Sequence, residues 1–192
     1  TIGAVSVTSN KPFSMTGTLT VPSGGTLDMG SSNDLGGTPT VANSGTIKTA
    51  STSASPLPSG IIWNGTENYY SNSSQTVMAG TYSNLTSGST TNTNAASGAL
   101  TVNGTLTVLN GTTLNMGTNV LSGTITTANA GTIRTQNIST LPIPSGLTWS
   151  TGKVTFDGGS AQTVPAGTYN DVILNNSAGA SLGATATING TL

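Results

Sequence analysis

Short runs in which hydroxyl-bearing and apolar side chains alternate recur along the chain. Residues 18–21 read TLTV, and residues 105–108 read TLTV again. A period of two is typical of a strand with one face on a core and the other in water. Glycine precedes many of these runs and can form the tight corners between strands. No stretch has the three-to-four spacing of an amphipathic helix, so the pattern predicts an all-β chain.

The chain contains nearly the same sequence twice. GTLTVPSGGTLDMG begins at Gly17 and GTLTVLNGTTLNMG begins at Gly104, 87 positions later, while Trp63 and Trp149 lie 86 positions apart. The predicted organisation is residues 1–16 as the end of a preceding repeat or an N-terminal strand, 17–103 as repeat 1, 104–189 as repeat 2, and 190–192 as the start of a third repeat. We therefore expect the chain to be part of a longer array of repeats.

Each long repeat is itself subdivided. Apolar or aromatic strand starts in the second copy fall at Thr105, Ile125, Leu147 and Tyr169. This regular spacing is on the scale of one turn of a parallel β-helix. It predicts a parallel β-helix (β-solenoid) with coils of about 22 residues and four coils per long repeat. The alternative is a string of immunoglobulin-like β-sandwiches, one per repeat.

The composition excludes several classes of function. Only 5% of the residues are charged and the net charge is −1, which argues against nucleic acid, because phosphate binding needs clustered Lys and Arg. No apolar segment is long enough for a membrane helix, so membrane insertion is not expected. The chain has neither cysteine nor histidine, which removes disulfides, thiolate metal sites and imidazole catalysis. We expect no cofactor.

An enzyme is the function that this inventory supports least. A β-helix that processes polysaccharide could use two carboxylates, and Asp28 with Asp34 is the closest pair in sequence. Since the second copy has Asn115 in place of Asp28, we interpret both acids as solvated turn residues and predict no enzymatic activity.

Four charged residues are candidates for inter-strand or lateral contacts. Lys48 and Arg134 occupy one position of SGTIKT and AGTIRT. They would either form a row of cations that binds a surface glycan or keep a sheet face from sticking to others. Glu67 and Lys153 align with opposite charge, and could meet between laterally packed rods.

Four repeated aromatic residues, Trp63, Trp149, Tyr82 and Tyr169, are candidates for glycan contact. Exposed rings could stack on sugars, which makes a carbohydrate-binding β-solenoid an alternative function. The other interpretation is that these rings fill the corners of a thin core.

Two further features concern the surface. Thr-x-Thr pairs such as Thr18 with Thr20 and Thr105 with Thr107 raise ice binding as a minor alternative, but the coil at Ile61–Trp63 interrupts the array. Asn-x-Ser/Thr sequons, the acceptors of N-glycosylation, occur at Asn64, Asn72, Asn84, Asn103, Asn110, Asn137, Asn175 and Asn189.

The phrases QTVPAGTYNDVILNNS, which begins at Gln162, and GTLTVLNGTTLNMGTN, which begins at Gly104, resemble repeats of large secreted bacterial surface proteins. The resemblance is to adhesin-like and autotransporter-like β-solenoids and covers nearly the whole chain. It implies an extracellular filament, stalk or surface adhesin, secreted or at the cell surface. We expect the partners to be further copies or coils, joined by stacking or strand addition, and surface glycans.

Overall fold

The structure is a computed structural model that describes residues 6–88 and 91–192, so positions 1–5 of the predicted segment 1–16 lie outside the described residues. Every regular element in the described part is a β-strand. The strands are β1 (Ser6–Thr8), β2 (Phe13–Met15), β3 (Thr18–Val21), β4 (Thr26–Asp28), β5 (Leu35–Gly37), β6 (Thr40–Asn43), β7 (Thr46–Thr49), β8 (Ile61–Tyr69), β9 (Thr76–Val77), β10 (Gly80–Ser87), β11 (Thr93–Ala96), β12 (Leu100–Val102), β13 (Thr105–Val108), β14 (Thr113–Asn115), β15 (Leu121–Ser122), β16 (Thr126–Asn129), β17 (Thr132–Thr135), β18 (Leu147–Phe156), β19 (Gln162–Val164), β20 (Gly167–Leu174), β21 (Ala180–Leu182) and β22 (Ala186–Ile188).

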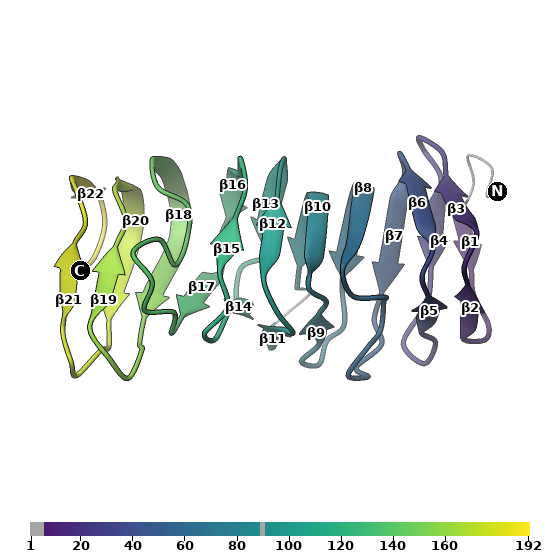
Figure 1. The fold of residues 1–192 in the computed structure, drawn as a ribbon, viewed down its shortest axis with the longest axis horizontal. Helices are drawn as coiled ribbons and strands as arrows, with labels where there is room; N and C mark the ends of the chain where they lie inside the picture. Colours follow the sequence, from purple (N-terminus) through teal and green to yellow (C-terminus); the bar gives the residue numbers. More distant parts are fainter. Residues whose placement is uncertain (1–5, 89–90) are drawn as a thin grey trace.

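The strands wind into a rod with β1 at one end and β22 at the other (Figure 1). Neighbouring coils pair in parallel, and the length of a coil varies: Thr66 pairs with Asn84 in a short one, and Thr18 pairs with Thr40 in a long one. This arrangement confirms the predicted parallel β-solenoid. It excludes the alternative of strung immunoglobulin-like sandwiches, because those consist of antiparallel sheets.

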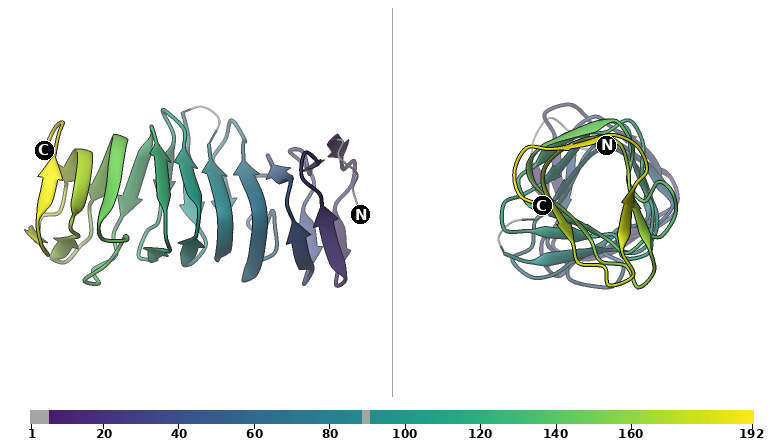
Figure 2. Two further views of the ribbon diagram at one scale, coloured as in Figure 1. Left: turned by 90° about the horizontal axis from the view of Figure 1, so that it is seen from above. Right: turned by 90° about the vertical axis from the view of Figure 1, so that its left-hand side faces the viewer.

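One coil has three sides. Strands β4, β5 and β6 make up a coil, and they pair with β1, β2 and β3 of the coil before it. The chain then returns with β7, which pairs with β4. Seen along the axis, the coils form a ring around a narrow interior (Figure 2). Side chains fill that interior, and one apolar cluster runs from Leu19 to Val172 through both sequence copies.

The alternation in sequence determines which side chains enter this core. In the column formed by β4, β7, β8, β10 and β13, Leu27, Ile47, Leu85 and Leu106 are inward and buried, and so is Glu67 of β8. The threonines beside them are at least partly exposed. Each coil therefore adds only a few large apolar residues, and the backbone ladders between coils supply the regular hydrogen bonds.

The sequence repeat is not a whole number of coils, so the two copies begin on different sides of the rod. From β3, four coil steps lead through β6, β8 and β10 to β12, and β13, the equivalent of β3, is the next strand along the chain. Leu19 on β3 therefore stacks on Val41, whereas its equivalent Leu106 stacks on Leu85, in another column. One long repeat spans four coils and one further side, so equivalent residues of successive copies lie on successive sides of the rod.

Candidate functional site

The outer surface of repeat 1 carries a small charged cluster. Lys48 Nζ lies 3.1 Å from Asp28 Oδ2 on the adjacent coil and 4.8 Å from the centre of the Tyr70 ring. The Tyr70 hydroxyl donates to Asp28 Oδ1 at 2.7 Å. Burial raises the pKa of Asp28, but the hydrogen bonds from Tyr70 and Gly30, together with Lys48, outweigh it and hold this pKa below its ordinary value. Burial and the neighbouring carboxylate raise the pKa of Tyr70 to about 12.

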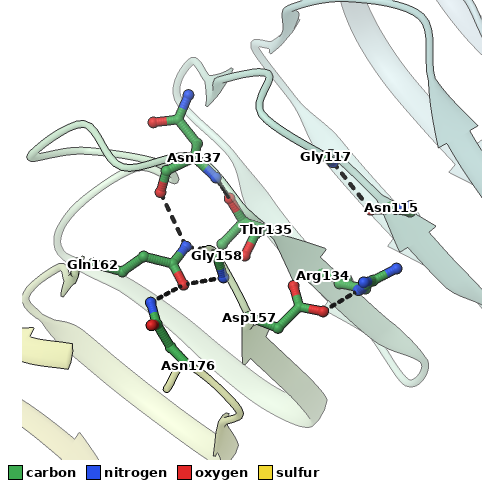
Figure 3. A network of polar contacts seen from close by, with 9 residues as sticks. All are labelled: Asn115, Gly117, Arg134, Thr135, Asn137, Asp157, Gly158, Gln162 and Asn176. Atoms are coloured by element: carbon green, nitrogen blue, oxygen red, sulfur yellow. Dashed lines mark hydrogen bonds and ion pairs between the residues drawn. The ribbon is translucent and has the colours of Figure 1, made fainter. Parts of the chain in front are cut away.

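Repeat 2 also has a cation at this position, but its acidic partner comes from a different position. Asn115 and Asp157 stand at the positions of Asp28 and Tyr70, and Arg134 Nε donates to Asp157 Oδ2 at 2.5 Å (Figure 3). Within the described residues each copy thus holds one ion pair between adjacent coils, with the acid on the preceding coil in repeat 1 and on the following coil in repeat 2. Such partly exposed pairs near the surface contribute little to stability.

The hypothesis of a row of cations is wrong for these residues. Lys48 lies on β7 in the nine-stranded sheet, and Arg134 lies on β17 in the seven-stranded sheet. They occupy different sides of the rod because of the one-side phase difference between the copies. Each cation contacts an acid of its own repeat instead of extending toward a neighbouring cation.

The expectation that Glu67 and Lys153 occupy equivalent positions in the two copies is also wrong. Glu67 lies in register with Ile47, and the equivalent Ile133 lies in register with Val154, which is therefore the counterpart of Glu67. One extra residue between Trp149 and Gly152 shifts the second copy. Glu67 is completely buried, so it cannot make a lateral contact between rods. Lys153 lies in register with Asp171.

The four aromatic candidates for glycan contact are buried as well. Trp63, Tyr82 and Tyr169 have 0% of their surface exposed and Trp149 has 1%, so none offers a ring to a sugar. Each tryptophan stacks in register with the tyrosine of the next coil. The tyrosine hydroxyls are used internally: Tyr82 donates to Met78 O at 2.5 Å, and Tyr169 donates to Pro165 O at 2.9 Å. These rings fill the core, which is the other interpretation of their repetition.

A glutamine in each copy joins several turns of chain, and the sequence interpretation missed it. Gln162 Nε2 donates to Thr135 O and Asn137 O, both at 3.0 Å, and its Oε1 accepts from Gly158 N at 2.6 Å and from Asn176 Nδ2 at 2.9 Å (Figure 3). We call this arrangement the glutamine bridge. It holds the corner between β17, β18 and β19.

The same bridge is present in repeat 1. Gln75 Nε2 donates to Thr49 O at 3.0 Å and to Ser51 O at 2.9 Å, and its Oε1 accepts from Ser71 N at 2.8 Å. Gln75 and Gln162 are the first residues of the repeated phrases QTVMAGTY and QTVPAGTY. That repetition was the available signal, because a buried amide that satisfies backbone groups is retained when its neighbours change.

The sequons differ in accessibility. Six have an exposed asparagine, namely Asn64, Asn72, Asn103, Asn110, Asn175 and Asn189. Asn84 and Asn137 are half-buried, and their amides donate to Gly65 O at 3.1 Å and Thr118 O at 2.6 Å. The exposed Asn64 also donates its amide, to Val41 O at 3.1 Å, so glycosylation at any of these three positions would break a contact.

The threonine pairs named from sequence do not make one array. Thr18 and Thr20 belong to the pair β3 and β6, while Thr105 and Thr107 belong to the nine-stranded sheet. That sheet instead has an outward column that sequence reasoning missed. Its successive members are Ser6, Thr26, Thr46 and Thr66; the next coil has Asn84 there, whose amide donates to Gly65 O and accepts from Thr105 N.

Two of the surface hollows include an acidic residue in their lining, Asp157 in one and Asp34 in the other, and the remaining ones described are lined by uncharged residues. The largest one described, of about 570 Å³, lies beside the exposed Ile138 and is lined by Thr118, Gln136, Asn137, Ser139, Gly159 and Ser160. The two acids closest in sequence, Asp28 and Asp34, are not the solvated turn residues that we expected: Asp28 lies on β4 and accepts from Tyr70, and Asp34 accepts from Ser51 at 2.6 Å.

Comparison with known proteins gives no relative from which a role could be transferred. No protein-family model matches the chain, and neither a curated protein nor a solved structure matches it. Within residues 6–88 and 91–192, no helix could cross a membrane and no three His, Cys, Asp or Glu side chains gather as a metal site would require.

Proposed function

We propose that the chain is a structural repeat module of an extracellular filament, stalk or surface adhesin. The observation that carries this proposal is the continuity of the rod: one apolar cluster and parallel ladders run through both sequence copies. The glutamine bridges tie turns of chain together inside each copy. A solenoid of this kind gains length by adding coils without requiring a new core.

Strand addition at the rod ends supplies a mechanism of assembly. β22 pairs with β20, and within the described residues its other edge has no partner strand. Asn189 N donates to Tyr169 O on β20, and N–H groups alternate along a parallel strand, so the N–H of Ala186 faces away from β20. A further coil, from the same polypeptide or from another subunit, can pair with this edge.

The test is electron microscopy of the native material with analysis of its layer lines. A filament built from these coils gives a strong axial repeat of about 4.8 Å along a continuous rod. For the isolated chain, Ala186→Pro removes an edge donor, and it should abolish end-to-end association and leave the monomer folded. Thr187→Ala keeps every backbone donor and serves as the matched control. Native material that contains only isolated monomers would contradict the filament.

One observation favours a second candidate, the binding of ice. The outward column on the nine-stranded sheet repeats a hydroxyl group in four successive coils, from Ser6 to Thr66, about 4.8 Å apart. A regular hydroxyl lattice can order water. The test is growth inhibition of ice crystals by the intact chain and by Thr66→Tyr, whose large ring would interrupt the column. Equal growth with and without the chain would eliminate this candidate.

A further inference from the structure

The carboxyl group of Glu67 is enclosed in the core of the rod. On β8 it lies in register between Ile47 of the preceding coil and Leu85 of the following one. No part of the residue is exposed. Its Oε1 accepts from Asn43 Nδ2 at 2.9 Å, whereas its Oε2 is buried and has no hydrogen-bond partner among the described residues. An ionised carboxylate with one unpaired oxygen is costly in such a place.

The fold does not require an acid here. The equivalent residue in repeat 2 is Val154, which is also completely buried and in register with Ile133 and Val172. Asn129, the counterpart of Asn43, is buried too, and its amide donates to Lys153 O at 3.4 Å. Repeat 2 thus shows the same coil built with an apolar side chain, which makes it a natural control for Glu67.

Among the described residues, no charged side chain lies beside Glu67 as a counter-ion. Of the strands packed against it, β6 and β10 contain no charged residue, and the charged residue of β7, Lys48, is paired with Asp28 on the outer face. The other titratable groups that act on it are the buried hydroxyls of Tyr69 and Tyr82. Burial raises the pKa of Glu67 to about 8, although the hydrogen bond from Asn43 lowers it. The group is therefore neutral inside the closed coil at neutral pH.

We propose that Glu67 is a proton-controlled latch, which keeps its coil closed while it carries a proton and opens the contact of β8 with β7 and β10 when the proton is lost. Ionisation places a charge between Ile47 and Leu85, and opening of the coil exposes that charge to water. The latch is independent of what the rod binds or supports, so it does not rest on the proposed function.

The direction of the pH effect follows from linkage. In the opened coil Glu67 ionises near its ordinary pKa of 4.5, whereas in the closed coil it keeps its proton up to about pH 8. The stability of the closed coil is therefore fully present below pH 4.5 and falls as the pH rises toward 8. Across this window the equilibrium constant for opening rises about tenfold per pH unit.

Hydrogen exchange of the intact chain tests the latch. After correction for the intrinsic rate, the amides of residues 66–68 should exchange about tenfold faster for each unit between pH 5 and 8. The equivalent amides of residues 153–155, next to Val154, serve as the internal reference and should not change. Glu67→Gln and Glu67→Val remove the ionisable group, so the exchange rates of residues 66–68 should no longer depend on pH in these variants. An unchanged profile in both variants would overturn the proposal.

A direct titration keeps the test independent of whether the variants fold. Glu67 is the only glutamate in the chain, so selective ¹³C labelling of glutamate gives a single carboxyl resonance in the wild-type protein. The latch requires that this resonance titrates near pH 8 in the folded chain. A midpoint near 4.5, or a folded state with the same exchange rates before and after the titration, would refute it.

Discussion

Repeat 1 and repeat 2 share one backbone plan but differ in where they place polar groups. Glu67 occupies a core position that Val154 occupies in repeat 2, and the anion beside the repeated cation moves from Asp28 to Asp157. The hydrogen bonds of the bridging glutamine and of the tyrosine hydroxyl to backbone carbonyls recur in both. The comparison teaches that buried polar groups that satisfy backbone atoms are kept, whereas surface pairs and single core side chains are free to change.

Exchanging the core residues should give the largest effect. Val154→Glu places a carboxyl without an established partner in the core of repeat 2, and should lower the free energy of unfolding by about 3 kcal/mol at pH 7. Glu67→Val should raise this free energy, because it removes the buried acid and keeps the shape found in repeat 2. Urea denaturation followed by tryptophan fluorescence measures both. Equal stability of Val154→Glu and wild type would mean that the core position tolerates an acid in either copy.

Removing a glutamine bridge should give the second largest loss of unfolding free energy. Gln162→Ala leaves Gly158 N, Thr135 O and Asn137 O without their side-chain partner, and should cost about 2 to 3 kcal/mol of unfolding free energy. Gln75→Ala should cost a similar amount in repeat 1. Gln136→Ala, at a partly exposed glutamine that lines the surface hollow, is the matched control and should change stability by less than about 0.5 kcal/mol. Chemical denaturation of the three variants measures these differences.

Removing the tyrosine hydroxyls should lower the free energy of unfolding by a smaller amount, and by different amounts in the two copies. Tyr82 donates to Met78 O and also lies 3.3 Å from the Tyr69 hydroxyl, while Tyr169 has the contact with Pro165 O. Tyr82→Phe should therefore cost about 1.5 kcal/mol and Tyr169→Phe about 1 kcal/mol in denaturant unfolding. A larger loss at Tyr169 would show that the Tyr69 contact adds nothing.

The surface ion pairs should have the smallest effect. Asp28→Asn and Asp157→Asn should each change the unfolding free energy by less than about 1 kcal/mol, and less in high salt. Because the pKa of Asp28 is lowered in the folded chain, its contribution is present at neutral pH and is lost as the pH falls through that lowered pKa. Thermal melts at two salt concentrations and at acidic pH measure this. Asp157→Asn provides the comparison in repeat 2.

The fold class was predictable from local patterns. Alternation of Thr with Leu or Val specifies strands with one dry face. The regular recurrence of these strands specifies coils that stack, because each coil must cover the apolar face of the next. The glutamine bridge was partly predictable, since Gln75 and Gln162 begin the repeated phrases. Their partners were not, because separate turns of the chain supply them: those of Gln162 lie at 135–137, at Gly158 and at Asn176.

The chain by itself determined the strands, their approximate spacing and the duplicated phrases, since these depend on local propensity and on short-range alternation. The tertiary structure alone decided which side of the rod each copy occupies and which residue enters the core. The length of a coil depends on its corners, so one long repeat ends one side beyond four coils. One extra residue between Trp149 and Gly152 then puts Val154 inside and Lys153 outside. Only the pairing of β18 with β17 on the neighbouring coil shows which of the two enters the core.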